Sequence, residues 1–249
     1  MTERILENLK DEREDNREGG SLLDIVLKQV SKRYTGRHLD AVKEIDLEIS
    51  QGSFVALLGP SGCGKSTLLN LLGGIDRPTE GVIEVGGLSL QSMGDDQLTE
   101  FRLKKLGFIF QFFNLLPTFT LEENVRLPLE IAGHDRAFVD STVSELLERV
   151  GLTERRGYLP AQLSGGEMQR TAVARAIVHK PAIVLADEPT GNLDSENGEK
   201  VLALLSQIHT DLGITIVMAT HSNEAASCAE RAIRMRDGRI VSDERNERI

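Results

Sequence analysis

One nine-residue stretch, GPSGCGKST at residues 59–67, constrains the fold more than any other part of the chain. It follows a continuous apolar run, SFVALL, and precedes the helical run LLNLLGG, which predicts a strand, a loop and a helix in that order. The glycines let successive backbone N–H groups turn toward one anion, and the start of the helix adds the positive end of its dipole. The pattern therefore predicts a phosphate-binding loop, whereas a chance glycine-rich turn would not need this strand and helix.

Two side chains at the end of this loop are expected to act on a bound nucleotide. Lys65 supplies a point charge for the β- and γ-phosphates, and the Ser66 hydroxyl is a ligand for Mg²⁺. The phosphate-contacting residues expected from the loop are Gly59, Pro60, Ser61, Gly62, Cys63, Gly64, Lys65, Ser66 and Thr67.

A pair of carboxylates follows a second apolar run, AIVLADE at residues 182–188. A strand ending in this pair places both acids at its carboxyl end, where open α/β sheets bind ligands. Asp187 is expected to hold the magnesium shell, and Glu188, one residue further, to polarise an attacking water. An isolated acidic pair would more often be a solvated loop, but beside a phosphate loop we expect a catalytic role.

Composition limits the class of protein. The chain has 249 residues, of which 40% are hydrophobic, as is ordinary for a globular protein with a core. No run approaches the roughly 20 apolar residues that a membrane-spanning helix needs. Only Cys63 and Cys228 are present, so neither a disulfide framework nor a zinc site is expected, and the formal charge of -10 argues against a nucleic-acid binder. We expect a soluble, cytoplasmic protein that binds no nucleic acid and does not insert into a membrane.

The first residues are expected to form an extension. MTERILENLKDEREDNREGG carries seven acidic and four basic side chains, and it lacks the apolar centre of a secretory signal. Such a segment cannot bury enough apolar surface to order itself, so residues 1–21 are expected to be flexible, with a docked helix as the alternative. Residues 22–249 are expected to form one domain.

Short apolar runs alternate with helical patterns along the rest of the chain, which predicts an α/β fold. IDLEI at residues 45–49 alternates with period two and predicts a half-buried strand, whereas SFVALL, AIVLAD and TIVMAT are typical of parallel strands covered on both faces. Residues 111–180 show helical periodicity without a clear buried strand, which predicts an inserted helical subdomain. Asp237 and Gly238, between two apolar runs near the C-terminus, predict a hairpin.

A third motif, QLSGGEMQRTAVARA at residues 162–176, places Ser-Gly-Gly at the start of an expected helix. Together with the phosphate loop, its LSGGE core makes the chain from about Leu22 onward resemble the ATP-binding-cassette (ABC) ATPases. The resemblance implies a P-loop NTPase (RecA-like) core with an N-terminal antiparallel β subdomain and an inserted helical subdomain at about residues 112–178. It also implies that the signature residues Ser164, Gly165, Gly166 and Glu167 contact ATP held by another subunit, as suits a glycine-bounded helix N-terminus.

The same resemblance assigns roles to single residues. Tyr34, which lies 25 residues before Gly59, matches the aromatic residue that stacks on adenine, although a strand tyrosine that packs locally is the alternative. Gln111 matches the glutamine that links magnesium and the attacking water to the transport partner, and Asp194 matches a loop aspartate that communicates across a dimer. His221 matches the histidine that contacts the γ-phosphate. The resemblance thus implies the catalytic residues Glu188, His221 and Gln111, and the magnesium ligands Ser66, Gln111 and Asp187.

Two positions depart from the commonest family pattern: the loop that usually reads SALD is GNLD here, and Ser222 follows His221 in place of the common Asp. Neither departure removes a catalytic group. EPTGNLD and FQFFNLLPTFTLEENVRLPL are similar to one branch of the family, the cassettes of lipoprotein release, macrolide efflux and the cell-division ABC complex. This implies an ATP- and Mg²⁺-dependent ATPase subunit that powers a separate membrane permease and lies on the inner face of the membrane through it. A homodimer is the simplest partner arrangement, with a heterodimer left open.

Other nucleotide-binding classes fit less well. ABC ATPases of DNA repair and chromosome maintenance carry long coiled coils between phosphate loop and signature, but here Lys65 and Ser164 lie only 99 positions apart without sustained heptads. Translation-factor types carry two cassettes in one chain. A P-loop kinase or GTPase would have no use for the signature motif.

Six of the eight phenylalanines lie between residues 101 and 119. Phe108 and Phe110 alternate on an expected strand and are predicted to be buried. Phe112, Phe113 and Phe119 follow in a loop-like stretch, where they form either a satellite cluster or an aromatic groove for a short helix of the permease.

Overall fold

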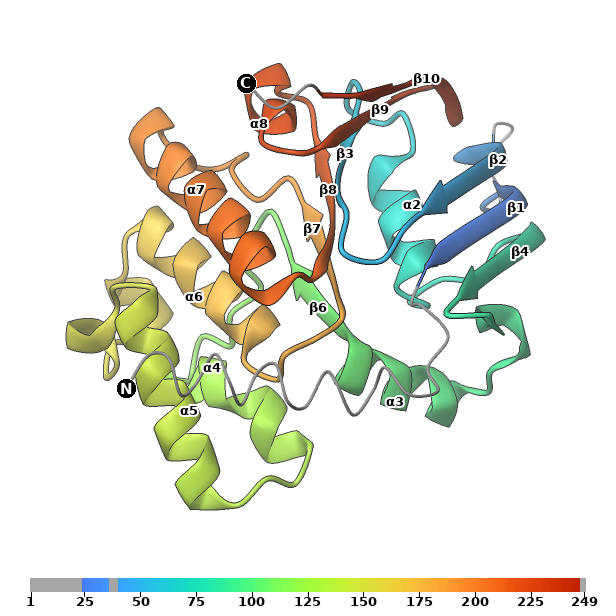
Figure 1. The fold of residues 1–249 in the computed structure, drawn as a ribbon. Helices are drawn as coiled ribbons and strands as arrows, with labels where there is room; N and C mark the ends of the chain where they lie inside the picture. The colour runs from blue at the N-terminus through green and yellow to red at the C-terminus, as the bar shows by residue number, and fades with distance from the viewer. Residues whose placement is uncertain (1–23, 36–39, 247–249) are drawn as a thin grey trace.

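A computed structural model describes residues 24–35 and 40–246. The expected extension, residues 1–21, lies outside the described residues. Two sheets organise the chain, one of six strands and one of four, with helices between and around them (Figure 1).

The six-stranded sheet has the order β10-β9-β3-β8-β7-β6. All neighbouring pairs from β9 to β6 are parallel, and only β10 runs antiparallel to its neighbour β9. The strands are β3 (Phe54–Leu58), β6 (Leu106–Ile109), β7 (Ile183–Asp187), β8 (Thr215–Thr220), β9 (Arg231–Arg236) and β10 (Arg239–Arg245). The carboxyl ends of the five parallel strands therefore lie along one edge.

The four-stranded sheet is antiparallel and has the order β2-β1-β4-β5. Its strands are β1 (Ile25–Lys32), β2 (Val42–Ile49), β4 (Glu80–Val85) and β5 (Leu88–Ser89). Along β2 the side chains of Ile45, Leu47 and Ile49 are buried while those between them are exposed. The half-buried strand predicted from IDLEI is therefore confirmed.

The helices form two layers against the main sheet (Figure 1). Helix α2 lies between the two sheets, and α6 and α7 cover the other face, with α4 and α5 packed beyond α6. The α-helices are α2 (Lys65–Leu72), α3 (Asp95–Lys105), α4 (Leu121–Ile131), α5 (Arg136–Arg149), α6 (Gly165–Ile177), α7 (Ser195–Leu212) and α8 (Asn223–Ser227). Short 3₁₀ turns are η1 (Leu90–Ser92), η2 (Thr153–Arg155) and η3 (Pro160–Gln162).

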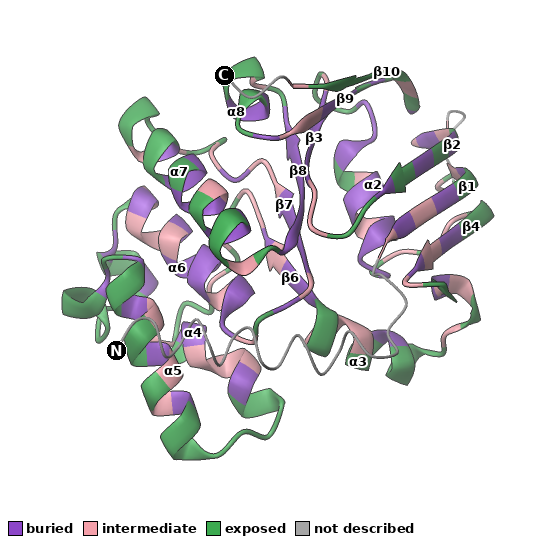
Figure 2. Ribbon diagram, viewed as in Figure 1, coloured by how far each residue is buried: buried purple, intermediate pink, exposed green. Residues whose placement is uncertain are grey.

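Strand β3 divides the interior into two cores. Phe54, Ala56 and Leu58 pack with residues of α6 and α7, whereas Val55 and Leu57 pack with α2 and the antiparallel sheet. Because successive side chains of a strand point to opposite faces, a strand buried on both sides must be apolar at every position. The three central strands β3, β7 and β8 are accordingly buried almost throughout (Figure 2).

Side-chain caps set where several helices begin. Thr120 caps α4 and Ser164 caps α6, each in a capping box with a glutamate three residues later. Asp194 caps α7, and its carboxylate accepts from the backbone N–H of Asn197 at 2.9 Å. These caps place the signature motif and the GNLD loop at the N-termini of two adjacent helices, α6 and α7.

Most of the expected elements are confirmed. The α/β fold class, the four expected strands and the Asp237–Gly238 hairpin between β9 and β10 all occur. Residues 111–180, which are fully described, contain α4, α5, η2, η3 and α6 but no strand. The division into domains stays a prediction.

The expected burial of Phe108 and Phe110 was wrong. Both are only half-buried, with ring centroids 5.7 Å apart, while Ile109 between them is fully buried. Phe108 lies on β6, which forms an edge of the main sheet, whereas Phe110 follows the end of that strand at Ile109 and so does not lie on it as expected.

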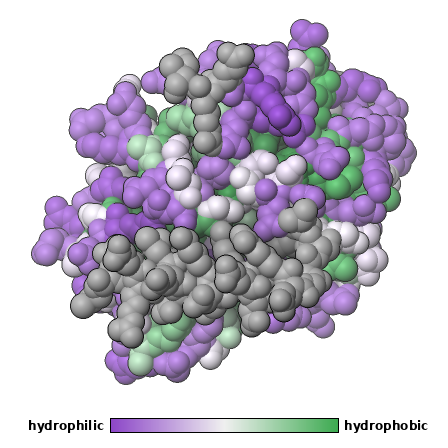
Figure 3. All heavy atoms as spheres, viewed as in Figure 1, coloured by the Kyte–Doolittle hydropathy of each residue, from purple (hydrophilic) through white to green (hydrophobic). Residues whose placement is uncertain are grey.

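Among the described residues, no helix is both long enough and apolar enough to cross a bilayer. Where its atoms are not grey, the face in Figure 3 consists largely of hydrophilic residues.

Candidate nucleotide site

Four adjacent strands of the main sheet deliver the predicted residues to one edge. The phosphate loop follows β3, His221 follows β8, Asp187 and Glu188 end β7, and Gln111 follows β6. Two backbone bonds tie these strand ends together: Gly59 N–H donates to the Thr220 carbonyl at 3.3 Å, and Glu188 N–H donates to the Ala219 carbonyl at 2.9 Å. Residues far apart in the chain thus share one site.

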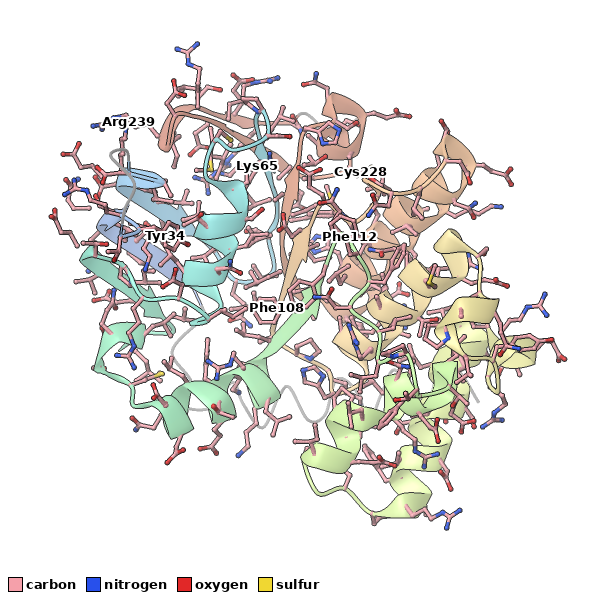
Figure 4. All side chains as sticks on the ribbon, turned by 180° about the vertical axis from the view of Figure 1, so that it is seen from behind. Tyr34, Lys65, Phe108, Phe112, Cys228 and Arg239 are labelled. Carbon is pink, nitrogen blue, oxygen red and sulfur yellow. The ribbon has the colours of Figure 1, made fainter. Side chains whose placement is uncertain are left out.

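The phosphate loop has the backbone that its glycines were expected to allow. Gly64, the N-cap of α2, has φ of 109°, and a Cβ there would lie 2.3 Å from the Ala41 carbonyl oxygen. No other residue fits such a position. Lys65 is buried, and its ammonium group donates to the carbonyls of Gly59 at 2.8 Å and Pro60 at 3.2 Å, so it lies folded back along its own loop (Figure 4).

Ser66 and Asp187 form an oxygen pair beside Lys65. The Ser66 hydroxyl donates to Asp187 Oδ1 at 3.0 Å. Burial is the main cause that raises the pKa of Asp187, and the Ser66 hydrogen bond opposes it. A hydroxyl and a carboxylate at this spacing are ligands that Mg²⁺ accepts, since it prefers oxygen donors.

Glu188 connects the lysine to the histidine. Its Oε1 lies 3.5 Å from the Lys65 ammonium group, and its Oε2 lies 2.8 Å from Nδ1 of His221. The Glu188 side chain is 15% exposed, whereas that of His221 is 57% exposed, so the histidine forms the outer end of the chain of contacts. Glu188 also has φ of 45°, an uncommon value for a residue with a side chain, and such backbone strain gathers at functional sites.

Gln111 lies half-buried next to the loop that follows Glu188. Its Nε2 would be 3.1 Å from a Cβ on Gly191, and its backbone carbonyl accepts from Asn192 Nδ2 at 2.7 Å. The glycine of the GNLD departure therefore leaves room for this glutamine, and the asparagine binds its backbone.

The signature glycines have a structural role within the chain itself. A Cβ on Gly166 would lie 2.4 Å from Asn197 Oδ1, so a larger residue at this contact of α6 with α7 would have to displace the Asn197 side chain. Ser164 and Glu167 cap each other: Ser164 N–H donates to Glu167 Oε2 at 2.8 Å, and Glu167 N–H donates to the Ser164 hydroxyl at 3.2 Å. The backbone bond from Ser164 is the main cause that lowers the pKa of Glu167. Contact of this motif with a partner's nucleotide stays a prediction.

Tyr34 lies after β1, near α2, within a small polar cluster (Figure 4). The Lys32 ammonium group lies 4.9 Å from the centre of its ring and donates to Asp76 Oδ1 at 2.6 Å. Burial is the main cause that raises the pKa of Tyr34, followed by a hydrogen bond with Asp76. Tyr34 thus makes local contacts, as the alternative interpretation expected. Its stacking on adenine stays a prediction.

Sequence reasoning missed three residues that hold the site together. Asn192 binds the loop of Gln111, and Asn197 donates to Asp194 Oδ2 at 2.8 Å at the start of its own helix α7. Arg175 of α6 donates to the carbonyls of Phe113 at 2.9 Å and Asn114 at 2.6 Å. The departure from SALD to GNLD was the one visible signal for Asn192. Arg175 carried no signal, because its acceptors are backbone atoms 62 and 61 positions away.

Known proteins are similar to this chain in sequence and in fold. A family model described as ABC transporter matches residues 42–191, more than half of the 249 residues. The chain is 45% identical over 225 residues to the lipoprotein-releasing system ATP-binding protein LolD of Geobacter metallireducens, covering 90% of this chain and 99% of that protein. It is 46% identical over 209 residues to the macrolide export ATP-binding/permease protein MacB of Rhodopirellula baltica, covering 83% of this chain and 31% of that protein.

A solved structure adds the fold. A dimeric ATP-binding cassette in a post-hydrolysis state, bound to ADP and Pi, superposes with a TM-score of 0.84 at 39% identity, covering 90% of this chain and all of that one (100%). The parallel sheet, the phosphate loop and the capped signature helix define an ATP-binding-cassette ATPase. The chain belongs to the ABC transporter family. The predicted transporter ATPase is thereby confirmed over the DNA-repair and translation-factor alternatives, since the matching relatives are named for transport.

Proposed function

We propose that this chain binds ATP and Mg²⁺ at the common edge of β3, β8, β7 and β6, and hydrolyses the ATP while paired with a second copy of itself. The observation that carries the proposal is the continuous contact from Lys65 through Glu188 to His221, at 3.5 and 2.8 Å. This contact joins three residues that follow neighbouring strands: Lys65 as the proposed phosphate-binding cation, Glu188 as the candidate general base and His221 as the candidate phosphate contact.

The contact between Lys65 and Glu188 suggests how the side chains of the site would rearrange when ATP binds. An incoming γ-phosphate carries more negative charge than a carboxylate, so it would replace Glu188 as the partner of the buried ammonium group. Glu188, released from Lys65 but still bonded to His221, would then face the attacking water as its proton acceptor. Gln111, from the neighbouring strand end, is proposed to orient that water.

Ser66 and Asp187 are proposed to hold the magnesium ion. Their oxygens already lie 3.0 Å apart, and both belong to the oxygen donors that Mg²⁺ prefers. When bound, the ion neutralises charge on the β- and γ-phosphates. Gln111 is proposed as a third ligand.

The signature segment is proposed to act on a second copy. Helix α6 begins at Gly165 with its first N–H groups bounded by glycines, which suits an incoming phosphate. Similarity to a dimeric cassette with ADP and Pi supports an arrangement in which Ser164 of one copy completes the phosphate site of the other. Asp194, at the adjacent start of α7, is proposed to contact the partner.

A mixture of two inactive variants tests this shared site. Lys65→Ala removes the phosphate charge, and Ser164→Arg blocks the signature surface while leaving the phosphate loop intact. In a mixed dimer, one of the two composite sites keeps both Lys65 and Ser164, and the other has neither. We therefore expect each mixed dimer to show up to about half of the ATPase activity of a wild-type dimer. A steady-state phosphate-release assay measures it. Absence of recovery, with mixed dimers proven by differently tagged copies, contradicts the model.

We further propose that the loop after β6 binds a membrane permease, which would hold the chain at the inner face of the membrane. Phe112 is 71% exposed at the tip of this loop, whereas Phe113 is half-buried. Phe119 lines a groove of about 660 Å³ together with Arg126 of α4 and Arg136 of α5. Phe112 is not among the residues that line this groove, so the proposal rests on its exposure, because exposed aromatic side chains often anchor interfaces.

The structure therefore selects Phe112, and not Phe113, for the docking test. Phe112→Asp should leave ATP affinity within about twofold, because the side chain faces solvent, but weaken co-purification with the permease by about tenfold or more. Leu88→Asp is the matched control, because Leu88 is 61% exposed on the other sheet. Equal permease recovery by both variants would exclude this loop as the docking surface.

A further inference from the structure

The segment that carries Gln111 turns sharply at two consecutive residues. Phe113 and Asn114 have φ of 61° and 48°, values that Asn adopts more readily than most residues but that are uncommon for a bulky residue such as Phe. Within the segment, Phe113 N–H donates to the Phe110 carbonyl at 3.1 Å and Asn114 N–H donates to the Phe112 carbonyl at 2.6 Å. A strained turn of this kind persists only where its surroundings hold it.

One side of the turn is held by the signature helix. Arg175 of α6 donates to the carbonyls of both strained residues, at 2.9 Å for Phe113 and 2.6 Å for Asn114. Burial lowers the pKa of Arg175, as expected for a guanidinium group that has left water. The planar fork of arginine suits two neighbouring acceptors, so it holds both peptide groups in one orientation.

The other side is held by the loop that leads to Asp194. Asn192 Nδ2 donates to the Gln111 carbonyl at 2.7 Å. Next to it, a Cβ on Gly191 would lie 3.1 Å from Gln111 Nε2, so a larger residue would press on the glutamine side chain. Asn192 thus binds the backbone of Gln111 and leaves the glutamine side chain available.

We propose that Asn192 is a positioning residue, which fastens the loop of Gln111 and Phe112 to the loop of Asp194 through the Gln111 carbonyl. The inference rests on the proposed function. Because the acceptor belongs to the peptide group that joins Gln111 to Phe112, a displacement of that peptide group must either carry the Asp194 loop with it or break this bond. Asn192 therefore couples the permease-docking loop to the dimer-contact loop within one chain.

Two substitutions of Asn192 distinguish the loss of its hydrogen-bond donor from repulsion between two oxygen atoms. Asn192→Ala removes the amide, and Asn192→Asp keeps its shape but turns an oxygen toward the Gln111 carbonyl. In the full-length chain we expect kcat for ATP hydrolysis to fall about 3- to 10-fold in Asn192→Ala and further in Asn192→Asp, as the loss of one hydrogen bond implies. KM for ATP should change less than twofold, because the phosphate loop is untouched.

Hydrogen exchange gives a readout besides activity. Peptides covering residues 110–116 should exchange about 3- to 10-fold faster in both variants, while peptides of β3 and β8 keep wild-type rates. Asn246→Ala is the matched control, because Asn246 Nδ2 also donates to a backbone carbonyl, that of Ala229 at 2.8 Å, but lies at the end of β10. It should leave kcat and the exchange of residues 110–116 unchanged.

The outcomes distinguish this inference from the proposed function. If wild-type protein hydrolyses ATP but the Asn192 variants keep wild-type kcat and exchange at residues 110–116, the positioning role is wrong and the proposed function stands. If Asn246→Ala lowers kcat equally, the effect is general destabilisation and the inference is also overturned. An inactive wild-type dimer, by contrast, would contradict the proposed function itself.

Discussion

Replacing Glu188 by glutamine is expected to leave ATP bound and nearly abolish its hydrolysis. The amide keeps the size of the carboxylate and can still pair with His221, but it cannot accept a proton from water. Loss of general-base assistance should lower kcat on the order of 10²–10⁴-fold. Because hydrolysis is expected to separate the two copies, the variant should also accumulate as an ATP-bound dimer on size-exclusion chromatography.

Glu145→Gln is the matched control, since Glu145 is an exposed glutamate on α5. It should have wild-type kcat and a wild-type elution volume with ATP. Hydrolysis by Glu188→Gln at a rate within a few-fold of wild type would show that the proton acceptor lies elsewhere.

Replacing Lys65 by alanine is expected to abolish binding itself. A hydrogen bond to a charged group contributes about 1.5–3 kcal/mol, and Lys65 is placed to make more than one with the phosphates. ATP affinity should therefore fall on the order of 100-fold or more, measured by isothermal titration calorimetry. The contrast with Glu188→Gln, which keeps affinity and loses turnover, separates binding from chemistry.

Folding of the lysine variant needs its own check, because Lys65 is buried and bonds the carbonyls of Gly59 and Pro60. Thermal unfolding followed by circular dichroism provides it. Lys104→Ala is the control, since Lys104 is an exposed partner of Glu100 on α3. A folded Lys65→Ala protein with near-normal ATP affinity would contradict the phosphate-loop assignment.

The predictions that the structure confirmed were based on residues that are close together in the sequence. The phosphate loop is contiguous, and its strand, glycines and helix are neighbours in the chain, so spacing alone predicted Gly64 at a position that only glycine can occupy. The apolar runs that became β3, β7 and β8 were readable for the same reason, because burial on both faces leaves no room for polar alternation.

Features that depend on contacts between distant segments could not be predicted from the sequence. Phe112 and Phe113 are indistinguishable in the sequence, and the turn held by Arg175 exposes the first and half-buries the second. Gly166 was interpreted only as a contact for nucleotide, yet its lack of a Cβ also leaves space for the Asn197 side chain of α7. The contact of Glu167 with ATP stays a prediction, and its carboxylate also caps α6 through the neighbouring Ser164.

The sequence by itself determined the class of site, because a phosphate loop and a carboxylate pair are each encoded by residues within one strand and its following loop. It also determined the family, through motifs whose spacing few other proteins share. Only the tertiary structure decided which side chains meet. The strand order places β8 between β3 and β7, and so brings His221, Lys65 and Glu188 into contact across 156 positions of chain, from 65 to 221. Such contacts depend on how the strands are ordered and on backbone atoms such as the Gln111 carbonyl, which carry no signature in the amino-acid sequence.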